Sequence, residues 1–445
     1  MPGVQMRGAL QAPALTSDPV RIPPGPIEEY NPTEDLLLWM TENFTRYGHI
    51  YKASILGRDV YVVSDPEYCE RILRRNWRNY ARSGQVVKRI SLLLGRGLIG
   101  SNGEFWAKQR RLIQHAFTKS SVSGLTNVIA DANAELLEAW IEAARSRKMV
   151  NVTTDVSRMV LKVTLVAIFG DDYAVVAPHF GILAEEPQRD LEFAQIFRSL
   201  SKVIRDIAAR RRGENATAKD FLGSMMQARD RDSGAPMSDG QLAMEAMTLI
   251  VAGHETTASI LNWIWFLLSR HPDVQTKLAA ELDGTAWQGA PTMEELPKYP
   301  YTRRIIDEAL RLYPPLWLMT RKALADDRLG SFFVPAGTEI YISPYLIQRS
   351  PTLWEVPEIF DPERMAPEHA ANRHEMALCP FGAGPRNCIG EFLARAEIQI
   401  HLMMVARELQ LRCDDTRPPE VTTGINLLSK HDFLMRPEFR SKAAG

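Results

Sequence analysis

The sequence predicts a mainly α fold in a single domain, with small β-sheets at one edge. Segments with apolar residues three to four positions apart recur along the 445 residues, and strand-like stretches between them are short. No repeat, low-complexity tract or linker divides the chain. We therefore expect one domain over 23–445, preceded by a flexible leader over 1–22.

The longest expected helix is 240–270, which would extend roughly 45 Å at 1.5 Å per residue. An Asp-Gly pair precedes it and a His-Pro pair ends it. Its stretch 247–268 is apolar enough to suggest a membrane span, but Gly253, His254 and Glu255 interrupt it, so a buried helix is the better interpretation. The other expected helices are 64–76, 104–118, 124–146, 153–170, 272–283 and 299–312.

The strand-like stretches predict two hairpins. YKASIL and DVYVVS, within 51–64, flank the pair Gly57-Arg58 and read as one hairpin. The stretch SFFVPAGTEIYIS, residues 331–343, reads as another, reversing at Pro-Ala-Gly. Both would belong to the small sheets at the edge of the helical domain.

Composition narrows the classes of function. A formal net charge of −1 gives no general attraction to nucleic acid or to an anionic membrane, so we expect neither as a partner. The four cysteines are too few and scattered for a disulfide framework or a zinc ribbon, which indicates a reducing cytoplasm. The N-terminus has no apolar stretch typical of a signal peptide, so we expect no membrane anchor.

One loop carries the strongest chemical signal. The stretch PFGAGPRNCIGEFLARAE, residues 380–397, surrounds Cys388 with Gly382, Gly384 and Gly390 and then enters a helix. Glycine permits positive φ and close backbone approach, so this loop can press against a large flat group. A thiol at the start of a helix feels the N-terminal field, which favours the thiolate that binds metals. Cys388 is therefore a candidate metal ligand.

A second motif, AGHETT at 252–257, lies in the middle of the longest expected helix. Its threonines could simply donate hydrogen bonds to carbonyls one turn earlier, as buried helical threonines often do. Alternatively, a helix opened at Gly253, with Glu255 and Thr256 side by side, could hold a small ligand and relay protons. The motif alone leaves both interpretations open.

Two further motifs place charged groups on one helix face. Glu308 and Arg311 are three residues apart and could form an ordinary exposed pair, but the apolar residues around them favour a buried one. Trp106 and Arg110 are four apart, an arrangement that suits a carboxylate ligand. An amphipathic helix with a cation near tryptophan is the simpler account of this second pair alone.

Taken together, these motifs resemble the cytochrome P-450 family of haem-thiolate monooxygenases, in order and spacing, from about residue 22 to the C-terminus. AGHETT is similar to the family's oxygen-binding helix, EALR to its ExxR motif and Trp106 with Arg110 to its WxxxR motif. The family pattern FxxGxRxCxG is matched by Phe381, Gly384, Arg386, Cys388 and Gly390.

The resemblance implies a haem b buried between the long central helix and the helix after the cysteine loop. Cys388 would be the metal ligand, with backbone N–H groups after it donating to the sulfur. Ala252 and Gly253 would leave room for O₂, while Thr256 and Glu255 would act catalytically by delivering protons. The residues implied in cofactor binding are Trp106, Arg110, Arg321, Phe381, Arg386, Cys388, Gly390, Ala252 and Gly253.

The implied reaction inserts one oxygen atom from O₂ into a hydrophobic organic substrate, by hydroxylation or epoxidation. Electrons from NAD(P)H would arrive through a separate ferredoxin or flavodoxin with its reductase, because no flavin or iron–sulfur segment follows the cysteine loop. This partner is expected to dock near Lys108, Arg111 and Arg395. We expect a cytoplasmic monomer.

The expected pocket is apolar, which favours a hydrophobic substrate such as a carotenoid, fatty acid, terpenoid, steroid or polyketide. Alternatively, the same site could perform peroxide-driven or non-redox chemistry, although the intact Glu255 and Thr256 argue against it. A haem-binding protein without catalysis is the other alternative. The expected lining residues are Val86, Val87, Ile90, Leu92, Leu93, Leu94, Met247, Ile250, Leu316, Trp317, Leu318 and Leu427.

Overall fold

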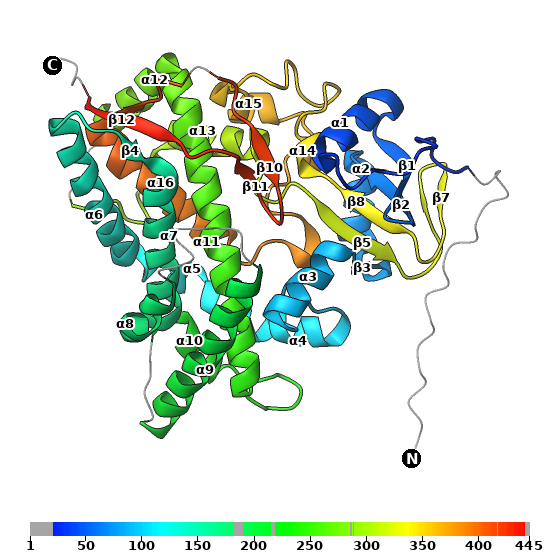
Figure 1. The fold of residues 1–445 in the computed structure, drawn as a ribbon, viewed down its shortest axis with the longest axis horizontal. Coiled ribbons are helices and arrows are strands. Elements are labelled where there is room, and N and C mark those ends of the chain that lie inside the picture. The colour runs from blue at the N-terminus through cyan, green and yellow to red at the C-terminus, as the bar shows by residue number, and fades with distance from the viewer. Residues whose placement is uncertain are drawn as a thin grey trace.

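The computed structural model describes residues 21–180, 190–214, 219–284, 287, 289–415 and 417–440. It confirms a mainly α domain, with small sheets gathered chiefly on one side of the helices (Figure 1). Of the expected leader 1–22, only Arg21 and Ile22 lie within the described residues, and Arg21 already pairs with Phe332 in a β-bridge.

The longest helix is α11 (Asp239–Arg270), which has 32 residues and crosses the middle of the molecule (Figure 1). Ser238 and Gln241 form a capping box at its start, and His271 caps its end just before Pro272. It packs most extensively against α7 (Val152–Phe169) and α9 (Asp190–Gly213). The prediction of one buried central helix is confirmed.

The other expected helices are present with small shifts at their ends. The segment 64–76 divides into α2 (Pro66–Glu70) and one π-helical turn, and 104–118 into α4 (Gly103–Ile113) and a 3₁₀ turn. The remaining helices are α1 (Leu36–Tyr47), α3 (Gln85–Leu94), α5 (Lys119–Ser123), α6 (Thr126–Arg145), α8 (Tyr173–Val176), α10 (Phe221–Gln227), α12 (Pro272–Gly284), α13 (Pro300–Leu312), α14 (Pro344–Ile347), α15 (Pro367–Ala370) and α16 (Glu391–Glu408).

The largest sheet has five strands in the order β1-β2-β8-β5-β3. Its β1 (Ile50–Ile55) and β2 (Arg58–Val63) form the first predicted hairpin, in antiparallel register around Leu56 and Gly57. The other three strands of this sheet are β3 (Tyr80–Arg82), β5 (Met319–Ala323) and β8 (Glu339–Ile342). The smaller sheets contain β4 (Val150–Asn151), β12 (Leu434–Phe439) and β9 (Leu409–Arg412), and β10 (Val421–Thr423) with β11 (Leu427–Ser429).

The second predicted hairpin is wrong. β7 (Phe332–Val334) pairs with the preceding β6 (Asp327–Leu329), whereas β8 joins the five-stranded sheet between β2 and β5. The Pro-Ala-Gly turn redirects the chain to another sheet because Gly337 N–H donates to Ala323 O at 2.8 Å, on β5. Both strands were recognised, but their pairing depends on partners distant in the sequence.

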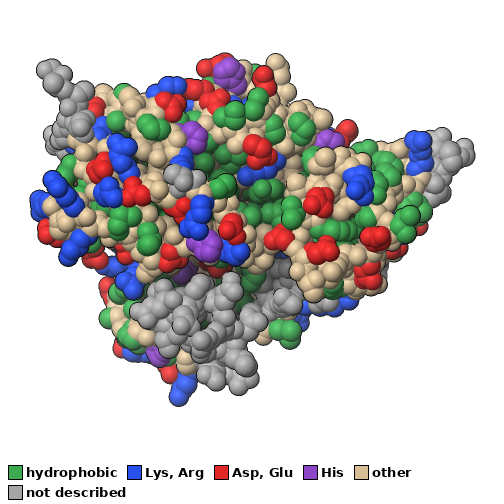
Figure 2. Space-filling model, turned by 45° about the horizontal axis from the view of Figure 1, so that its top comes forward, with side chains coloured by type: hydrophobic (Ala, Val, Ile, Leu, Met, Phe, Trp, Pro, Cys, Tyr) green, Lys and Arg blue, Asp and Glu red, His purple; other side chains and the backbone are tan. Residues whose placement is uncertain are grey.

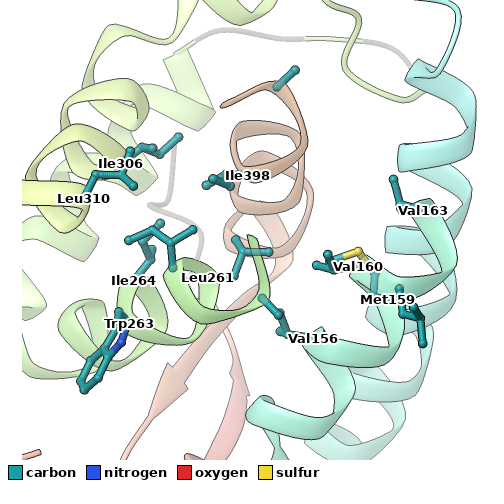
Figure 3. Close-up of a cluster of buried hydrophobic side chains, with 14 of the residues drawn as sticks. Val156, Met159, Val160, Val163, Leu261, Trp263, Ile264, Ile306, Leu310 and Ile398 are labelled. Atoms are coloured by element: carbon teal, nitrogen blue, oxygen red, sulfur yellow. The ribbon is translucent and has the colours of Figure 1, made fainter. Parts of the chain in front are cut away.

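The core lies where α7, α11, α13 and α16 meet (Figure 3). Leu261 and Ile264 of α11 point toward Ile398 of α16 and Ile306 of α13, and Val156 of α7 closes the cluster from the other side (Figure 3). This packing holds the middle of α11 and the start of α16 in a fixed relation. Those two segments bound the candidate site.

The surface carries both signs of charge. Figure 2 shows Lys and Arg side chains interspersed with Asp and Glu over the visible face, without a large region of one sign. The described helices include none that combines the length and hydropathy required to cross a bilayer.

Candidate functional site

The cysteine loop is held in one conformation by its glycines and by backbone hydrogen bonds. Gly382 and Gly384 both have φ of +70°, and a Cβ on Gly384 would lie 2.0 Å from Leu73 O. Cys388 N–H donates to Phe381 O at 2.9 Å, which closes the loop just before α16. Gly390 differs, because its φ is −91° and it serves as the N-cap of α16.

Cys388 lies before α16 rather than within its first turn. Its sulfur is deep in the protein, although part of the residue's surface remains accessible, and Gly390 N–H donates to the sulfur as predicted. Burial nevertheless raises the pKa of the free thiol, and Glu391 adds to that rise. The backbone hydrogen bond from Gly390 favours the thiolate, as expected, but burial outweighs it in the free thiol.

Two arginines, the half-buried Arg82 and the buried Arg321, face each other across neighbouring strands. Arg82 of β3 lies directly opposite Arg321 of β5 in the antiparallel register, so both side chains are on the same side of the sheet. Burial and the charge of Arg110 lower the pKa of Arg82 to about 10. Burial and the charges of Arg82 and Arg386 hold the pKa of Arg321 well below its usual range. Like charges placed in this way favour an anion between them.

Two further arginines approach from α4 and from the cysteine loop. Arg110 donates to Asn387 O at 2.9 Å and to its Oδ1 at 3.0 Å. Arg386 donates to Ser101 O at 3.1 Å, and its guanidinium lies over the Trp106 ring, 4.1 Å from the centroid. Burial lowers the pKa of both, to about 9 for Arg386. The structure thus brings Trp106, Arg110, Arg321 and Arg386 together, as the sequence predicted.

These four arginines fit a group that carries two carboxylates. None of the four makes an ion pair with an Asp or Glu of the described chain, and Arg82 Nε has no hydrogen-bond partner. Cys388 lies close enough to influence the pKa of Arg82 and Arg110. A thiol with accessible surface near a set of unneutralised cations suits haem, with its iron and two propionates.

The facing wall of the site is a short stretch of α11. Residues 251–256 are all partly exposed, whereas the residues on either side, 245–250 and 257–268, are buried. The first residues of α16, 391–395, are likewise partly exposed before the helix becomes buried. Both core helices therefore keep accessible surface over one short stretch, within otherwise buried sequence.

The threonine of AGHETT takes the simpler of the two predicted arrangements. Thr256 Oγ1 donates to Ala252 O at 2.6 Å, and α11 continues through Gly253 without opening. A Cβ on Gly253 would lie 3.6 Å from Thr164 of α7, an ordinary van der Waals contact, so the role of Gly253 stays a prediction. His254 also faces α7, where it bonds Ser157 Oγ at 2.9 Å.

Glu255 has a partner that the sequence did not reveal. Asn426, in the turn between β10 and β11, donates its amide N–H to Glu255 Oε2 at 2.5 Å. Burial raises the pKa of Glu255, and the Asn426 hydrogen bond opposes that rise. The carboxyl group is therefore a poorly solvated acid that lies next to Thr256 in sequence and on the wall of the site.

The Glu308–Arg311 pair is fully buried, as its apolar flanks predicted. Arg311 donates to both carboxylate oxygens at 2.7 Å, and Arg364 adds a third guanidinium bond at 3.0 Å. Arg311 also donates to Gln348 O, and Gln348 Oε1 accepts from Cys379 N–H at 3.0 Å. The pair thus connects directly to the start of the cysteine loop, which supports a structural role.

The expected lining residues divide by burial. Leu316 and Leu318 are partly exposed, whereas Met247, Ile250 and Trp317 are buried in the core. Leu92 is 86% exposed, so it lies on the outside. Leu94 and Leu427 are also buried, and Val87 is half-buried. The structure does not describe the side chains of Val86, Ile90 and Leu93.

The cations expected to dock a partner are already neutralised within the chain. Lys108 pairs with Asp230 at 3.1 Å and Arg111 with Asp232 at 3.3 Å. Arg395 pairs with Asp307 and with Glu391. This surface therefore carries ion pairs rather than free positive charge.

Sequence reasoning missed Arg82 and Asn426. Arg82 is recognisable only once β3 is placed opposite β5, since nothing in YARSG marks a ligand. The Gly-Ile-Asn sequence at 424–426 is typical of a turn, but its contact with α11 depends on tertiary structure.

Comparison with known proteins agrees with this geometry. The family model Cytochrome P450 matches residues 25–180 and 176–436. Cyclooctatin synthase of Streptomyces melanosporofaciens is 32% identical over 394 residues, covering 82% of this chain and 83% of that protein. Pentalenene oxygenase of Streptomyces avermitilis is 28% identical over 406 residues, covering 87% of this chain and 90% of that protein.

Solved structures share the fold at lower identity. The cytochrome P450DA haem domain has a TM-score of 0.81 at 23% identity, covering 94% of this chain and 98% of its own. The retinoic acid-bound cyanobacterial CYP120A1 has a TM-score of 0.83 at 23% identity, covering 95% and 100%.

Proposed function

The chain belongs to the cytochrome P450 family and is a haem-thiolate monooxygenase, and we propose that it oxidises a predominantly hydrocarbon substrate at the site between α11 and the cysteine loop. The observation that carries this proposal is that Cys388 lies near a cluster of four arginines, none of which makes an ion pair with an acid of the described chain, while residues 251–256 of the central helix α11 are partly exposed. The reaction would insert one atom of O₂ and reduce the other to water, with two electrons and two protons.

We assign the binding of haem to residues on three sides of the site. Cys388 would hold the iron, with Phe381 packed in the same loop, while Arg82, Arg110, Arg321 and Arg386 would bind the propionates. Thiolate-bound haem supplies the redox chemistry that activates O₂. The protein's contribution is to fix orientation, exclude water and supply protons.

The proton-delivering groups proposed are Glu255 and Thr256. Glu255 is partly exposed, and the poor solvation of its carboxyl group raises its pKa, which favours a role as a proton donor. The Thr256 hydroxyl donates to Ala252 O at 2.6 Å, which leaves its oxygen lone pairs available as acceptors on the site wall. The proton would pass from Glu255 to the site by way of this hydroxyl.

A terpene-like hydrocarbon is the substrate class that we favour. The relatives pentalenene oxygenase and cyclooctat-9-en-7-ol 5-monooxygenase act, by their names, on an alkene and an alkenol. The partly exposed Leu316 and Leu318 beside the site suit such a molecule because they offer no polar group. Fatty acids and carotenoids are the classes against which this proposal should be tested.

We further propose that the electrons come from NAD(P)H through a ferredoxin or flavodoxin with its reductase, and that the protein acts as a cytoplasmic monomer. Because Lys108, Arg111 and Arg395 are paired with acids, the partner would meet a mixed-charge surface. Association should then depend only modestly on salt.

The first experiment is a titration of the haem-loaded protein with terpenes, carotenoids, fatty acids and steroids, followed through the Soret absorption band. A change of spin state with terpenes supports the proposed class, and a response to another class alone replaces it. Cys388→Ser should abolish the thiolate spectrum, whereas Cys413→Ser, at a partly exposed site on another segment, should not. An unchanged spectrum in Cys388→Ser would overturn the assignment of the ligand.

A further inference from the structure

The turn between β10 and β11 reaches from the surface into the site. Ile425 at its tip is 41% exposed, whereas the following Asn426 is 4% exposed. Gly424 N–H donates to Asn426 O at 3.0 Å, which closes the turn and fixes its shape. A polar side chain buried to this extent requires a partner, and here the partner is the carboxyl group of Glu255.

Two hydrogen bonds attach this turn to α11. Asn426 Nδ2 donates to Glu255 Oε2 at 2.5 Å, and Ser259 Oγ donates to Leu427 O at 2.7 Å. Glu255 and Ser259 are four residues apart, so they lie on one face of the helix. Only the first of these bonds involves a group that can carry a proton to the site.

Two more hydrogen bonds attach the turn to the segment after α13. Leu427 N–H donates to Pro315 O at 2.9 Å, and Trp317 Nε1–H donates to Gly424 O at 3.2 Å. The same segment contains the partly exposed Leu316 and Leu318. One short turn therefore contacts both the apolar wall of the site and the carboxyl group on α11.

The chemistry of the amide matters as much as its position. Asn426 is a neutral donor, so it orients the Glu255 carboxyl group without the strong attraction of a cation. Residues 315–318 and 424–427 contain no charged side chain. On α11 itself, His254 faces Ser157, and Glu245 accepts from Leu98 N–H more than two turns earlier. Within the described chain, Glu255 makes no ion pair.

We propose that Asn426 is a positioning residue, which holds the Glu255 carboxyl group in the orientation for proton delivery and links that orientation to the substrate-facing segment 315–318. The proposal rests on the proton-delivering role of Glu255 proposed above. A substrate that presses on Leu316 or Leu318 would act through the turn on the same hydrogen bond. The turn would thereby make proton delivery sensitive to occupation of the site.

The test compares Asn426→Ala and the isosteric Asn426→Asp with a matched control. Ser259→Ala removes the other bond between the same helix and the same turn, and it leaves Glu255 untouched. With haem, substrate and a surrogate ferredoxin system, the fraction of electrons recovered in product should fall about tenfold in both Asn426 variants. It should stay within about twofold in Ser259→Ala, and the substrate dissociation constant within about twofold in all three.

A second readout does not depend on turnover. The infrared band of the Glu255 carboxyl group, identified by its loss in Glu255→Gln, reports protonation directly. In Asn426→Ala the carboxyl group should stay protonated to a pH about one unit higher, because a hydrogen bond to the charged form is lost. An unchanged band, or an equal effect of Ser259→Ala on product yield, would overturn the proposal.

The role of Glu255 and the role of Asn426 can be contradicted separately. If Glu255→Gln forms product as efficiently as the parent, Glu255 does not deliver protons, and both proposals fall. If Glu255→Gln is impaired while both Asn426 variants are normal, only the positioning role falls. Thermal unfolding of each variant, monitored by circular dichroism, identifies any protein that is no longer folded.

Discussion

Two poorly solvated glutamates in this protein have opposite surroundings. Glu308 accepts from Arg311 twice, from Arg364 and from Asp361 N–H, so its oxygens are fully engaged. Glu255 has one neutral amide donor, Asn426. Burial raises the pKa of both carboxyl groups, but two guanidiniums oppose the rise at Glu308. A glutamate held by cations fixes structure, whereas one held by an amide keeps the freedom to exchange a proton.

The largest effect that tests this contrast is on folding. Glu308→Gln leaves Arg311 and Arg364 without their counter-charge in the core, and we expect it to destabilise the protein by about 5 kcal/mol, the upper end for such pairs. Urea unfolding measures this. Glu142→Gln is the control, since Glu142 forms an exposed pair with Arg145 at the same spacing, and it should cost about 0.5 kcal/mol or less. Equal losses of stability in Glu308→Gln and Glu142→Gln would show that the buried pair contributes no more than the exposed one.

A third poorly solvated glutamate extends the comparison. Glu397 of α16 has an Oε1 atom without any hydrogen-bond partner, and burial raises its pKa from 4.5 to about 8. Between these pH values the unfolded chain has lost this proton and the folded protein has kept it. The stabilising contribution is therefore complete below pH 4.5 and is lost as pH rises to about 8.

Glu397→Gln should accordingly remove this part of the pH dependence. Relative to the parent, the variant should gain about 5 kcal/mol of stability between these two pH values, at 1.36 kcal/mol per unit. Thermal unfolding midpoints of both proteins, measured from pH 4.5 to about pH 8, test this difference in stability. Glu138→Gln, at an exposed site on the neighbouring α6, should follow the parent. If the stability of Glu397→Gln changed with pH as that of the parent does, the raised pKa of Glu397 would be contradicted.

Glu255→Gln should show the reverse of the Glu308 result. We expect product formation to fall about a hundredfold, because the proton donor is lost, while stability changes by about 1 kcal/mol or less. Initial rates at saturating substrate and urea midpoints on the same preparations measure both. A variant that unfolds readily but turns over normally would reverse the assignment of the two glutamates.

The smallest expected effect belongs to the hydroxyl group beside Glu255. Thr256→Ala removes an acceptor on the site wall and the bond to Ala252 O. The yield of product per NADPH should fall about tenfold, with the electrons appearing as hydrogen peroxide. Thr257→Ala, on the buried side of the same helix, is the control. Undiminished yield in Thr256→Ala would exclude this hydroxyl from proton delivery.

The helices were predictable from the sequence to a greater extent than the strands. The 240–270 segment has caps and an apolar pattern that are local, and α11 begins and ends within one residue of it. The stretch 331–343 also has clear strand character, yet its two strands enter different sheets. Strand pairing depends on distant partners, and β8 finds its parallel neighbour β2 nearly 300 residues away along the chain.

The residues of the site also differ in how far the sequence could predict them. Cys388, Trp106, Arg110 and Arg386 belong to motifs with fixed spacing, so the sequence pointed to them. Arg82 and Asn426 act through tertiary neighbours, and neither lies in a pattern that short-range reasoning can recognise. The raised pKa of the free Cys388 thiol could not be predicted because the helix field is local whereas the cost of burial depends on the whole fold.

The register of Arg82 opposite Arg321 has a consequence for how much of this protein a cell can maintain. Two facing cations that repel each other weaken the edge of the five-stranded sheet, and a dianionic cofactor bound between them strengthens it by mass action. Newly made chains would therefore survive proteolysis in proportion to the supply of that cofactor. Abundance of the enzyme becomes a readout of haem availability, set by one pair of facing residues.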